Sequence, residues 1–366
     1  MRNELSLLIK PAGALCDLGC SYCFYRRIAA DRDTAPGVMQ DETAETLLER
    51  VLSLRPAALS IAFQGGEPTL AGLSWYRRFL QNIAEKNTAK IPVNLSIQTN
   101  GMHINDDWAR LFKEHGFLVG LSLDGDKATN DRFRLDKNGN SVYERTLAAA
   151  ELLNKHGVEF NILSVLTNES AYEIERTYAD FKRRGFRFLQ FIPFVDEGTG
   201  QSLTSEAYTF FLKRCFDLWY ADFQKGDYIS IRHIDNYIRI LLGEPPENCA
   251  MCGVCGRYYV IEADGSVYPC DFYCKDTYRL GTVFDPAPFD ESETHRTFLT
   301  DSCRIHASCA ACKYAALCRG GCRRDRTDEL TKNKYCEAYR AFFDYALERM
   351  LTVARSLPEG EGKGSE

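Results

Sequence analysis

The cysteines constrain this chain more than any other feature. Its 366 residues include 15 cysteines, and these stand in two groups. Cys16, Cys20 and Cys23 lie near the start, Cys215 stands alone, and the remaining cysteines lie between Cys249 and Cys336. Disulfide scaffolds are typical of small secreted domains, whereas clustered cysteines in a long intracellular chain are more often metal ligands. The distribution therefore predicts a metal protein.

Charge and hydropathy exclude some classes of partner. The chain carries 45 Lys and Arg against 51 Asp and Glu, a net charge of −6, whereas nucleic-acid binders usually carry a basic surplus. No stretch approaches the 18 consecutive apolar residues of a transmembrane helix. The apolar run that ends at Lys10 is too short for a secretory signal. We expect a cytoplasmic protein without nucleic-acid or membrane partners.

The first 230 residues alternate strand and helix patterns. Short apolar runs at 5–9, 59–63, 93–98, 118–123, 160–165 and 188–192 predict strands. Amphipathic stretches at 42–54, 75–85, 106–114, 143–155 and 172–184 predict helices between them. Six strand–helix units indicate an α/β fold with a parallel sheet. They are fewer than the eight units of a closed barrel, so we expect a partial (β/α)6 barrel, with a flat doubly wound sheet as the alternative.

The periodicity weakens after about residue 227, where the cysteines become dense. Stretches 258–262 and 266–269 flank Asp264-Gly265 and predict a β-hairpin. A last amphipathic helix is expected at 337–355. With about 150 residues per domain, we divide the chain into an α/β core at 1–230 and a cysteine-rich domain at 231–350. Residues 351–366 are expected to form a disordered tail.

Cys16, Cys20 and Cys23 follow the first predicted strand with the spacing Cys-x3-Cys-x2-Cys. Three thiolates on one loop can ligate three irons of a 4Fe-4S cluster and leave the fourth iron open to another ligand, because such clusters usually take four cysteines. A zinc site is the alternative. Zinc cysteines usually come as Cys-x2-Cys pairs or with histidine, and no fourth ligand lies nearby.

The second predicted strand ends in Gln64-Gly65-Gly66-Glu67-Pro68. Alone this sequence predicts only a turn, but with the cysteine loop one strand earlier it resembles the radical S-adenosylmethionine (radical SAM) superfamily. The resemblance implies that a 4Fe-4S cluster on Cys16, Cys20 and Cys23 binds S-adenosylmethionine. It further implies roles for seven residues: Tyr22 and the Val195 backbone at the adenine, Gly65, Gly66 and Glu67 at the methionyl amine, and Ser122 and Arg134 at the ribose and carboxylate.

The later cysteines resemble the SPASM domain, which binds auxiliary 4Fe-4S clusters. The resemblance implies two fully ligated clusters, and therefore three 4Fe-4S clusters in all. Auxiliary cluster I would take Cys249, Cys255, Cys270 and Cys322, and auxiliary cluster II would take Cys309, Cys312, Cys318 and Cys336. A zinc ribbon is the alternative for the Cys-x2-Cys part. Cys215, Cys252, Cys274 and Cys303 are left without a role.

Longer motifs narrow the resemblance to the anaerobic sulfatase-maturating enzymes, over about residues 5–351. They include Cys23-Phe24-Tyr25, Gln98-Thr99-Asn100-Gly101 and the stretches at 63–72, 264–273 and 318–324. That family oxidises a Cys or Ser of a sulfatase to Cα-formylglycine after a 5′-deoxyadenosyl radical removes hydrogen from Cβ. The resemblance implies that Asp271 is the general base.

The implied partners are an unfolded sulfatase segment as peptide substrate and a flavodoxin or ferredoxin as electron donor. Two other functions stay open at this point. One is a radical SAM peptide maturase that forms thioether or carbon–carbon cross-links. The other is a non-catalytic zinc or electron-transfer module.

Overall fold

A computed structural model of the chain describes residues 4–30, 37–194, 203–287, 289–327 and 332–357. Its strands are β1 (Glu4–Ile9), β2 (Ala58–Phe63), β3 (Val93–Thr99), β4 (Leu118–Ser122), β5 (Phe160–Leu166), β6 (Phe188–Pro193), β7 (Ser230–Ile231), β8 (Tyr259–Ile261), β9 (Ser266–Tyr268), β10 (Gly281–Thr282), β11 (Arg326–Thr327) and β12 (Lys332–Asn333). Its helices are α1 (Phe24–Ala30), α2 (Asp41–Ser53), α3 (Leu73–Lys86), α4 (Asp106–Glu114), α5 (Lys127–Asn130), α6 (Tyr143–Lys155), α7 (Asn168–Tyr172), α8 (Ile174–Arg183), α9 (Ser205–Phe223), α10 (Arg232–Leu241), α11 (Glu293–Ser302), α12 (Ala315–Cys318) and α13 (Cys336–Ser356).

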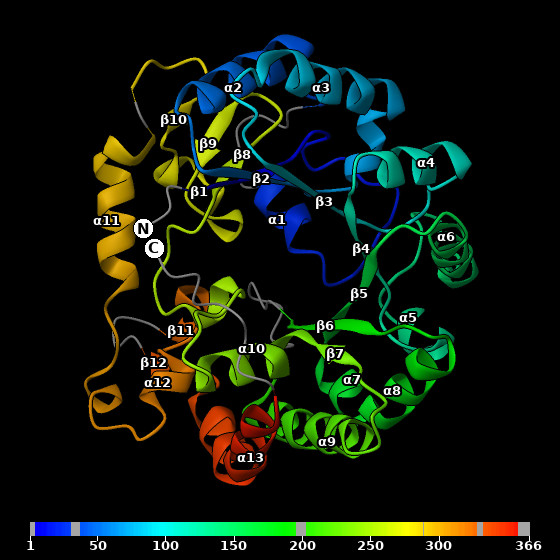
Figure 1. Ribbon diagram of the computed structural model, residues 1–366, viewed down its shortest axis with the longest axis vertical. Helices are drawn as coiled ribbons and strands as arrows, with labels where there is room; N and C mark the ends of the chain where they lie inside the picture. The colour runs from blue at the N-terminus through cyan, green and yellow to red at the C-terminus, as the bar shows by residue number, and fades with distance from the viewer. Residues whose placement is uncertain (1–3, 31–36, 195–202, 288, 328–331, 358–366) are drawn as a thin grey trace.

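The main sheet is a curved, open barrel. Its strand order is β10-β9-β8-β1-β2-β3-β4-β5-β6-β7, and β1 to β7 are parallel. Among the described residues no pairing joins β10 to β7, so the sheet does not close. Figure 1 shows α2, α3, α4, α6, α8 and α9 on the outer side of this curve and α1 on the inner side. The expected partial barrel is confirmed, and each of the six predicted strands is present.

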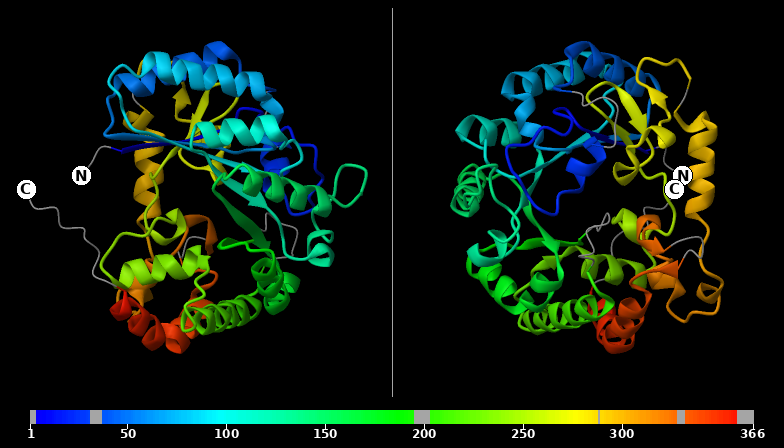
Figure 2. Two further views of the ribbon diagram at one scale, coloured as in Figure 1. Left: turned by 45° about the vertical axis from the view of Figure 1, so that its right-hand side comes forward. Right: turned by 180° about the vertical axis from the view of Figure 1, so that it is seen from behind.

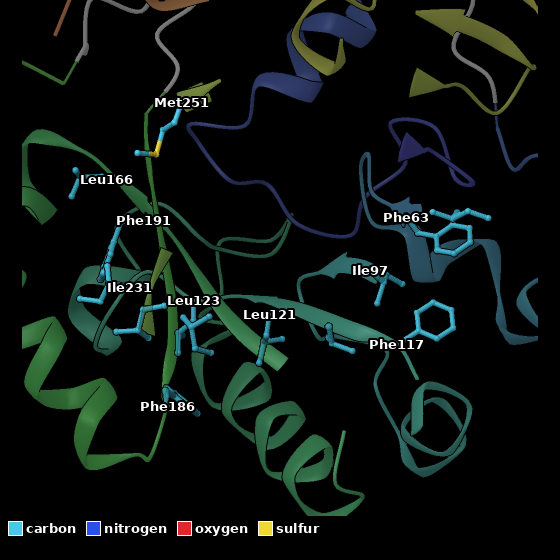
Figure 3. Packing of buried hydrophobic residues seen from close by; sticks show 14 of the residues in the cluster. Phe63, Ile97, Phe117, Leu121, Leu123, Leu166, Phe186, Phe191, Ile231 and Met251 are labelled. Carbon is cyan, nitrogen blue, oxygen red and sulfur yellow. The ribbon is translucent and has the colours of Figure 1, made fainter. Parts of the chain in front are cut away.

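Alternation along the strands separates two environments. Phe63, Ile97 and Phe117 pack between the sheet and the outer helices (Figure 3), where apolar burial stabilises the fold. On the opposite face of β3 and β4, Gln98 Nε2 donates to Ser122 Oγ at 2.9 Å. A Cβ at Gly120 would stand 2.1 Å from Gln98 Oε1, so the glycine makes room for this polar pair. The inner face of the barrel therefore carries polar side chains at this position.

The cysteine-rich part is joined to the core by the sheet itself. The hairpin β8–β9 forms around Asp264-Gly265 as predicted, with Gly265 at a φ of 82°. The sequence did not predict that β8 would pair in parallel with β1. The expected boundary between 230 and 231 falls inside β7, so the two parts share one ten-stranded sheet. Helix α13 packs against α9 and α10 and brings the end of the chain back to the barrel (Figure 2).

One predicted boundary was wrong. Residues 351–356 belong to α13 rather than to a disordered tail, because Val353 and Ala354 are buried and continue the apolar face of that helix; the helix expected at 337–355 is confirmed. Residues 358–366 lie outside the described part. The helix expected at 172–184 is confirmed as α8, and a capping box of Thr167 and Ser170 starts a short helix, α7, before it. Within the described residues no helix is both long enough and apolar enough to span a membrane.

Candidate active site

The loop after β1 brings the first three cysteines together at the carboxyl end of the parallel strands. Cys20 packs with Leu18, Met102 and Val142, and Cys16 and Cys23 lie against the same cluster. Burial raises the pKa of the Cys16 thiol to about 12 and also raises the pKa of Cys20. The bare thiols are therefore protonated at neutral pH, and binding a metal there would release protons.

The glycine loop after β2 lies in direct backbone contact with the cysteine loop. Gly66 N donates to Gly13 O at 2.9 Å, and Glu67 N donates to Leu15 O at 2.7 Å. A Cβ at Gly66 would stand 2.1 Å from Leu15 O. Only glycine lets the two loops approach this closely, so the two motifs singled out in the sequence form one structural unit.

Gly66→Ala is expected to separate the two loops, because its new Cβ would collide with a backbone carbonyl rather than with a flexible side chain. We expect a loss of about 1–3 kcal/mol in the free energy of unfolding, together with loss of iron from the first cysteine loop. Thermal unfolding and iron analysis of the reconstituted protein measure both effects. Gly37→Ala is the matched control, since no atom of the described residues lies within 4 Å of its Cβ position. A Gly66→Ala protein with normal stability and iron content would contradict the prediction.

Glu67 is 1% exposed, and its carboxylate already has several internal partners. Oε1 accepts hydrogen bonds from Thr69 N at 3.0 Å, Thr69 Oγ1 at 2.5 Å and Thr99 Oγ1 at 2.8 Å. Oε2 accepts from Asn100 N at 2.7 Å. The family resemblance implied that this residue binds the methionyl amine. The structure shows that its carboxylate also connects the glycine loop to the end of β3 through Thr99 and Asn100.

Tyr22, Asp124 and Arg134 form a buried polar network beside the cysteine loop. The Tyr22 hydroxyl donates to Asp124, and Arg134 Nη1 donates to Tyr22 Oη at 2.7 Å. Burial opposes the charge on Arg134, but neighbouring Tyr22, Cys20 and Asp124 raise its pKa above the usual value. The network therefore places a permanent cation close to Cys20. Sequence reasoning did not assign Asp124, although it directly follows the predicted strand that contains Ser122.

Of two further residues predicted to bind S-adenosylmethionine, the structure describes Ser122 but not Val195. Ser122 ends β4 on the inner face of the barrel, where it accepts the hydrogen bond from Gln98. Val195, expected at the adenine, lies outside the described residues.

The later cysteines line two separate cavities. The first has a volume of about 210 Å³, and its lining includes Cys249, Cys255, Cys270 and Cys322 together with Gln190 and Ile192 of β6. The second has a volume of about 620 Å³, and its lining includes Cys309, Cys312, Cys318 and Cys336. Each lining contains the four cysteines that the SPASM resemblance implied for one cluster, and the second lining contains Cys252 and Cys303 as well. The residues therefore fit two bound groups that each take four thiolates.

A single zinc ion and a four-iron cluster need different arrangements of thiols. Zinc holds four ligands around one ion at about 2.0–2.3 Å, and no group of three His, Cys, Asp or Glu side chains in the described ranges converges in that way. A cube of four irons presents a different iron to each thiolate, so its ligands stand farther apart. Burial, together with the nearby Cys322 and Cys255, raises the pKa of the Cys249 thiol to about 12.

Four cysteines remain outside these sets. Cys215 is fully buried in α9 as a small apolar side chain. Cys252 and Cys303 line the second cavity. Cys274 is buried, and Lys10 Nζ donates to its Sγ at 3.3 Å.

Asp271 directly follows Cys270 and is 3% exposed. Lys10 Nζ lies 2.8 Å from its Oδ1, and the Tyr25 hydroxyl donates to its Oδ2. Tyr25 is two residues beyond Cys23, so this contact joins the first cysteine loop to the first cavity. Sequence reasoning did not assign Lys10 a role, because a lysine after an apolar strand normally faces solvent.

Comparison with known proteins agrees with this geometry. The radical SAM superfamily matches residues 12–181. The cysteine-type anaerobic sulfatase-maturating enzyme of Clostridium novyi (strain NT) is 41% identical and covers 97% of this chain and 98% of its own. The serine-type anaerobic sulfatase-maturating enzyme of Klebsiella pneumoniae is 31% identical, and the match covers 96% of this chain and 89% of that enzyme. The solved structure of native anSMEcpe with bound AdoMet and Cp18Cys peptide is 42% identical in sequence and has a TM-score of 0.90. The match covers 96% of this chain and 99% of that structure.

Proposed function

The chain belongs to the anaerobic sulfatase-maturating enzymes of the radical SAM superfamily, and from this membership we propose how its own residues act. It is a radical SAM oxidoreductase that converts a Cys or Ser side chain of a sulfatase to Cα-formylglycine and uses a 4Fe-4S cluster and S-adenosylmethionine. The observation that carries this conclusion is 41–42% identity over at least 96% of the chain. The cross-linking alternative has no comparable support.

We propose that Cys16, Cys20 and Cys23 hold the cluster that binds S-adenosylmethionine. When bound, this pair supplies a 5′-deoxyadenosyl radical that removes a hydrogen atom from the target Cβ. The backbone of Gly65, Gly66 and Glu67 receives the methionyl amine, since the Glu67 carboxylate already accepts hydrogen bonds from Thr69, Thr99 and Asn100. Tyr22, Ser122, Arg134 and the Val195 backbone complete the proposed set; the buried cation of Arg134 suits a carboxylate.

We propose two auxiliary 4Fe-4S clusters, so that the chain holds three. Cys249, Cys255, Cys270 and Cys322 would ligate one, and Cys309, Cys312, Cys318 and Cys336 the other, as the linings of the two cavities suggest. In this proposal residues 1–230 form the radical SAM core and residues 231–350 the SPASM domain, with the shared sheet fixing one against the other.

Asp271 is the proposed general base. It accepts the proton from the target thiol or hydroxyl, while the electron released by the substrate passes to the neighbouring auxiliary group. Its position beside Cys270 would bring the proton acceptor close to a bound auxiliary cluster, which would supply the electron acceptor. The thioaldehyde formed from a cysteine target would then be hydrolysed by water to the aldehyde, with release of sulfide. A flavodoxin or ferredoxin is the proposed electron donor. Clustered cysteines that act as metal ligands suit a reducing compartment, and we propose the cytoplasm.

The substrate is proposed to be an unfolded sulfatase segment with a cysteine target, since the cysteine-type relatives have the higher identity. Anaerobic protein reconstituted with iron and sulfide, given S-adenosylmethionine, a strong reductant and a Cys-x-Pro-x-Arg peptide, is expected to replace the sulfur of the peptide with an aldehyde oxygen. Mass spectrometry detects the change, and the matching Ser peptide is expected to react more slowly. Deoxyadenosine without a modified peptide would contradict this choice of substrate, and a cross-linked peptide would favour the alternative function.

A further inference from the structure

Lys10 is a buried cation at the junction of three parts of the site. It follows β1 directly and is only 2% exposed. Its ammonium lies 2.8 Å from Asp271 Oδ1, 3.0 Å from Glu262 Oε1 and 3.3 Å from Cys274 Sγ, and 4.8 Å from the centre of the Tyr25 ring. Burying an ammonium group is costly unless it is paired, so these partners account for its position.

The stem of Lys10 reaches the glycine loop as well. A Cβ at Gly65 would stand 3.1 Å from Lys10 Cβ and Cγ, so the methylene groups of the lysine lie against the loop proposed to bind the methionyl amine. One side chain therefore contacts both that loop and the carboxylate of Asp271. The length of the Lys10 side chain and its position directly after β1 determine how the glycine loop and Asp271 lie relative to each other.

The two oxygens of Asp271 are held differently. Oδ2 accepts a hydrogen bond from the Tyr25 hydroxyl. Oδ1 is in ion-pair contact with Lys10, yet it accepts no well-directed hydrogen bond from the residues that the structure describes. The carboxylate is thus held at both oxygens, and Oδ1 is buried with Lys10 beside it.

We propose that Lys10 is a positioning residue that acts through Asp271. Its ammonium fixes the carboxylate in the orientation in which Oδ1 receives the proton of the target side chain. This inference rests on the proposed role of Asp271 and adds to it the residue that orients the base. Without the cation, Asp271 keeps only its contact with Tyr25 and can turn about that contact.

The competing explanation is that Lys10 only neutralises Glu262, its neighbour across the β1–β8 pair. Two variants separate these roles. Lys10→Met keeps a long side chain and removes the charge, so that Glu262 and Asp271 both lose the Lys10 cation. Lys10→Met combined with Glu262→Gln removes one of these carboxylates as well. If Lys10 only neutralises Glu262, the double variant regains the stability that Lys10→Met loses. Asp271 still lacks the Lys10 cation in the double variant.

Three quantities are measured: the thermal unfolding of the metal-free chain, the deoxyadenosine formed and the aldehyde formed in the reconstituted protein. For Lys10→Met we expect a lower unfolding temperature and an aldehyde kcat about 100-fold lower, the size of effect that a 1 Å misplacement produces. The peptide KM and the rate of deoxyadenosine formation are expected to stay unchanged. The double variant is expected to regain thermal stability and to keep the low ratio of aldehyde to deoxyadenosine.

Recovery of aldehyde formation together with stability in the double variant would overturn the proposal, because Lys10 would then serve only the ion pair. A parallel fall of deoxyadenosine and aldehyde in Lys10→Met would also overturn it. If Lys10→Met does not fold, the double variant supplies the folded protein on which the ratio is measured. Failure of the wild-type chain to make aldehyde would count against the proposed function and not against Lys10.

Discussion

Asp271→Asn is expected to lower aldehyde formation by about 10²–10⁴-fold, the usual contribution of general acid–base catalysis. Asparagine keeps the shape of the side chain and its place between Lys10 and Tyr25, but its amide cannot accept the substrate proton at neutral pH. The first hydrogen abstraction does not need this proton transfer. Deoxyadenosine is therefore expected to form while the peptide stays unmodified, as chromatography and peptide mass spectrometry would measure.

Asp276→Asn is the matched control, because Asp276 is exposed and lies in the same segment. It is expected to leave aldehyde formation unchanged. The iron content of both variants is expected to equal that of the wild-type chain, since neither change removes a proposed ligand. Wild-type turnover by Asp271→Asn would show that another group accepts the proton.

Cys20→Ala is expected to abolish deoxyadenosine formation altogether. Cys20 is the most buried of the three thiols on the first loop, and a cluster held there by two thiolates would lack one of its anchors. With three clusters of four irons, the variant is expected to lose about a third of its iron. The two auxiliary sets line cavities in another part of the fold, so their iron is expected to remain.

Cys215→Ala is the control for this variant, since Cys215 is equally a buried thiol but belongs to none of the proposed ligand sets. It is expected to keep full iron content and full deoxyadenosine formation. Retention of all the iron by Cys20→Ala, or loss of iron from every set at once, would contradict the assignment of three independent clusters.

Local sequence patterns predicted the parallel core well. The six core strands were recognisable because short apolar runs end at turns, and the helices because apolar residues recur at the helical period. The pairing of β8 with β1 left no such signal, since strand partners far apart in sequence are chosen by packing in the folded state. The domain boundary expected between 230 and 231 falls inside β7, the short strand at one edge of the shared sheet.

Some parts of the candidate site could be predicted from the sequence, and others could not. The spacing of Cys16, Cys20 and Cys23 showed that they share a loop, because all three lie on one turn of chain. The division of the later cysteines into two sets was implied by resemblance, since spacing alone is compatible with many groupings. The partners of Glu67 and Lys10 could not be foreseen, because they come from other strands and determine what each buried charge is free to do.

The parallel pairing of β8 with β1 has a consequence for the order in which the chain folds. Lys10 and Glu262 lie 252 residues apart in sequence, so the first strand emerges from the ribosome long before its outer neighbour. Until then the free edge of β1 can pair with other chains, a known route to aggregation. Closing so long a loop is slow. The barrel can begin to assemble during synthesis, but the proposed base meets its cation only when nearly three quarters of the chain has been made.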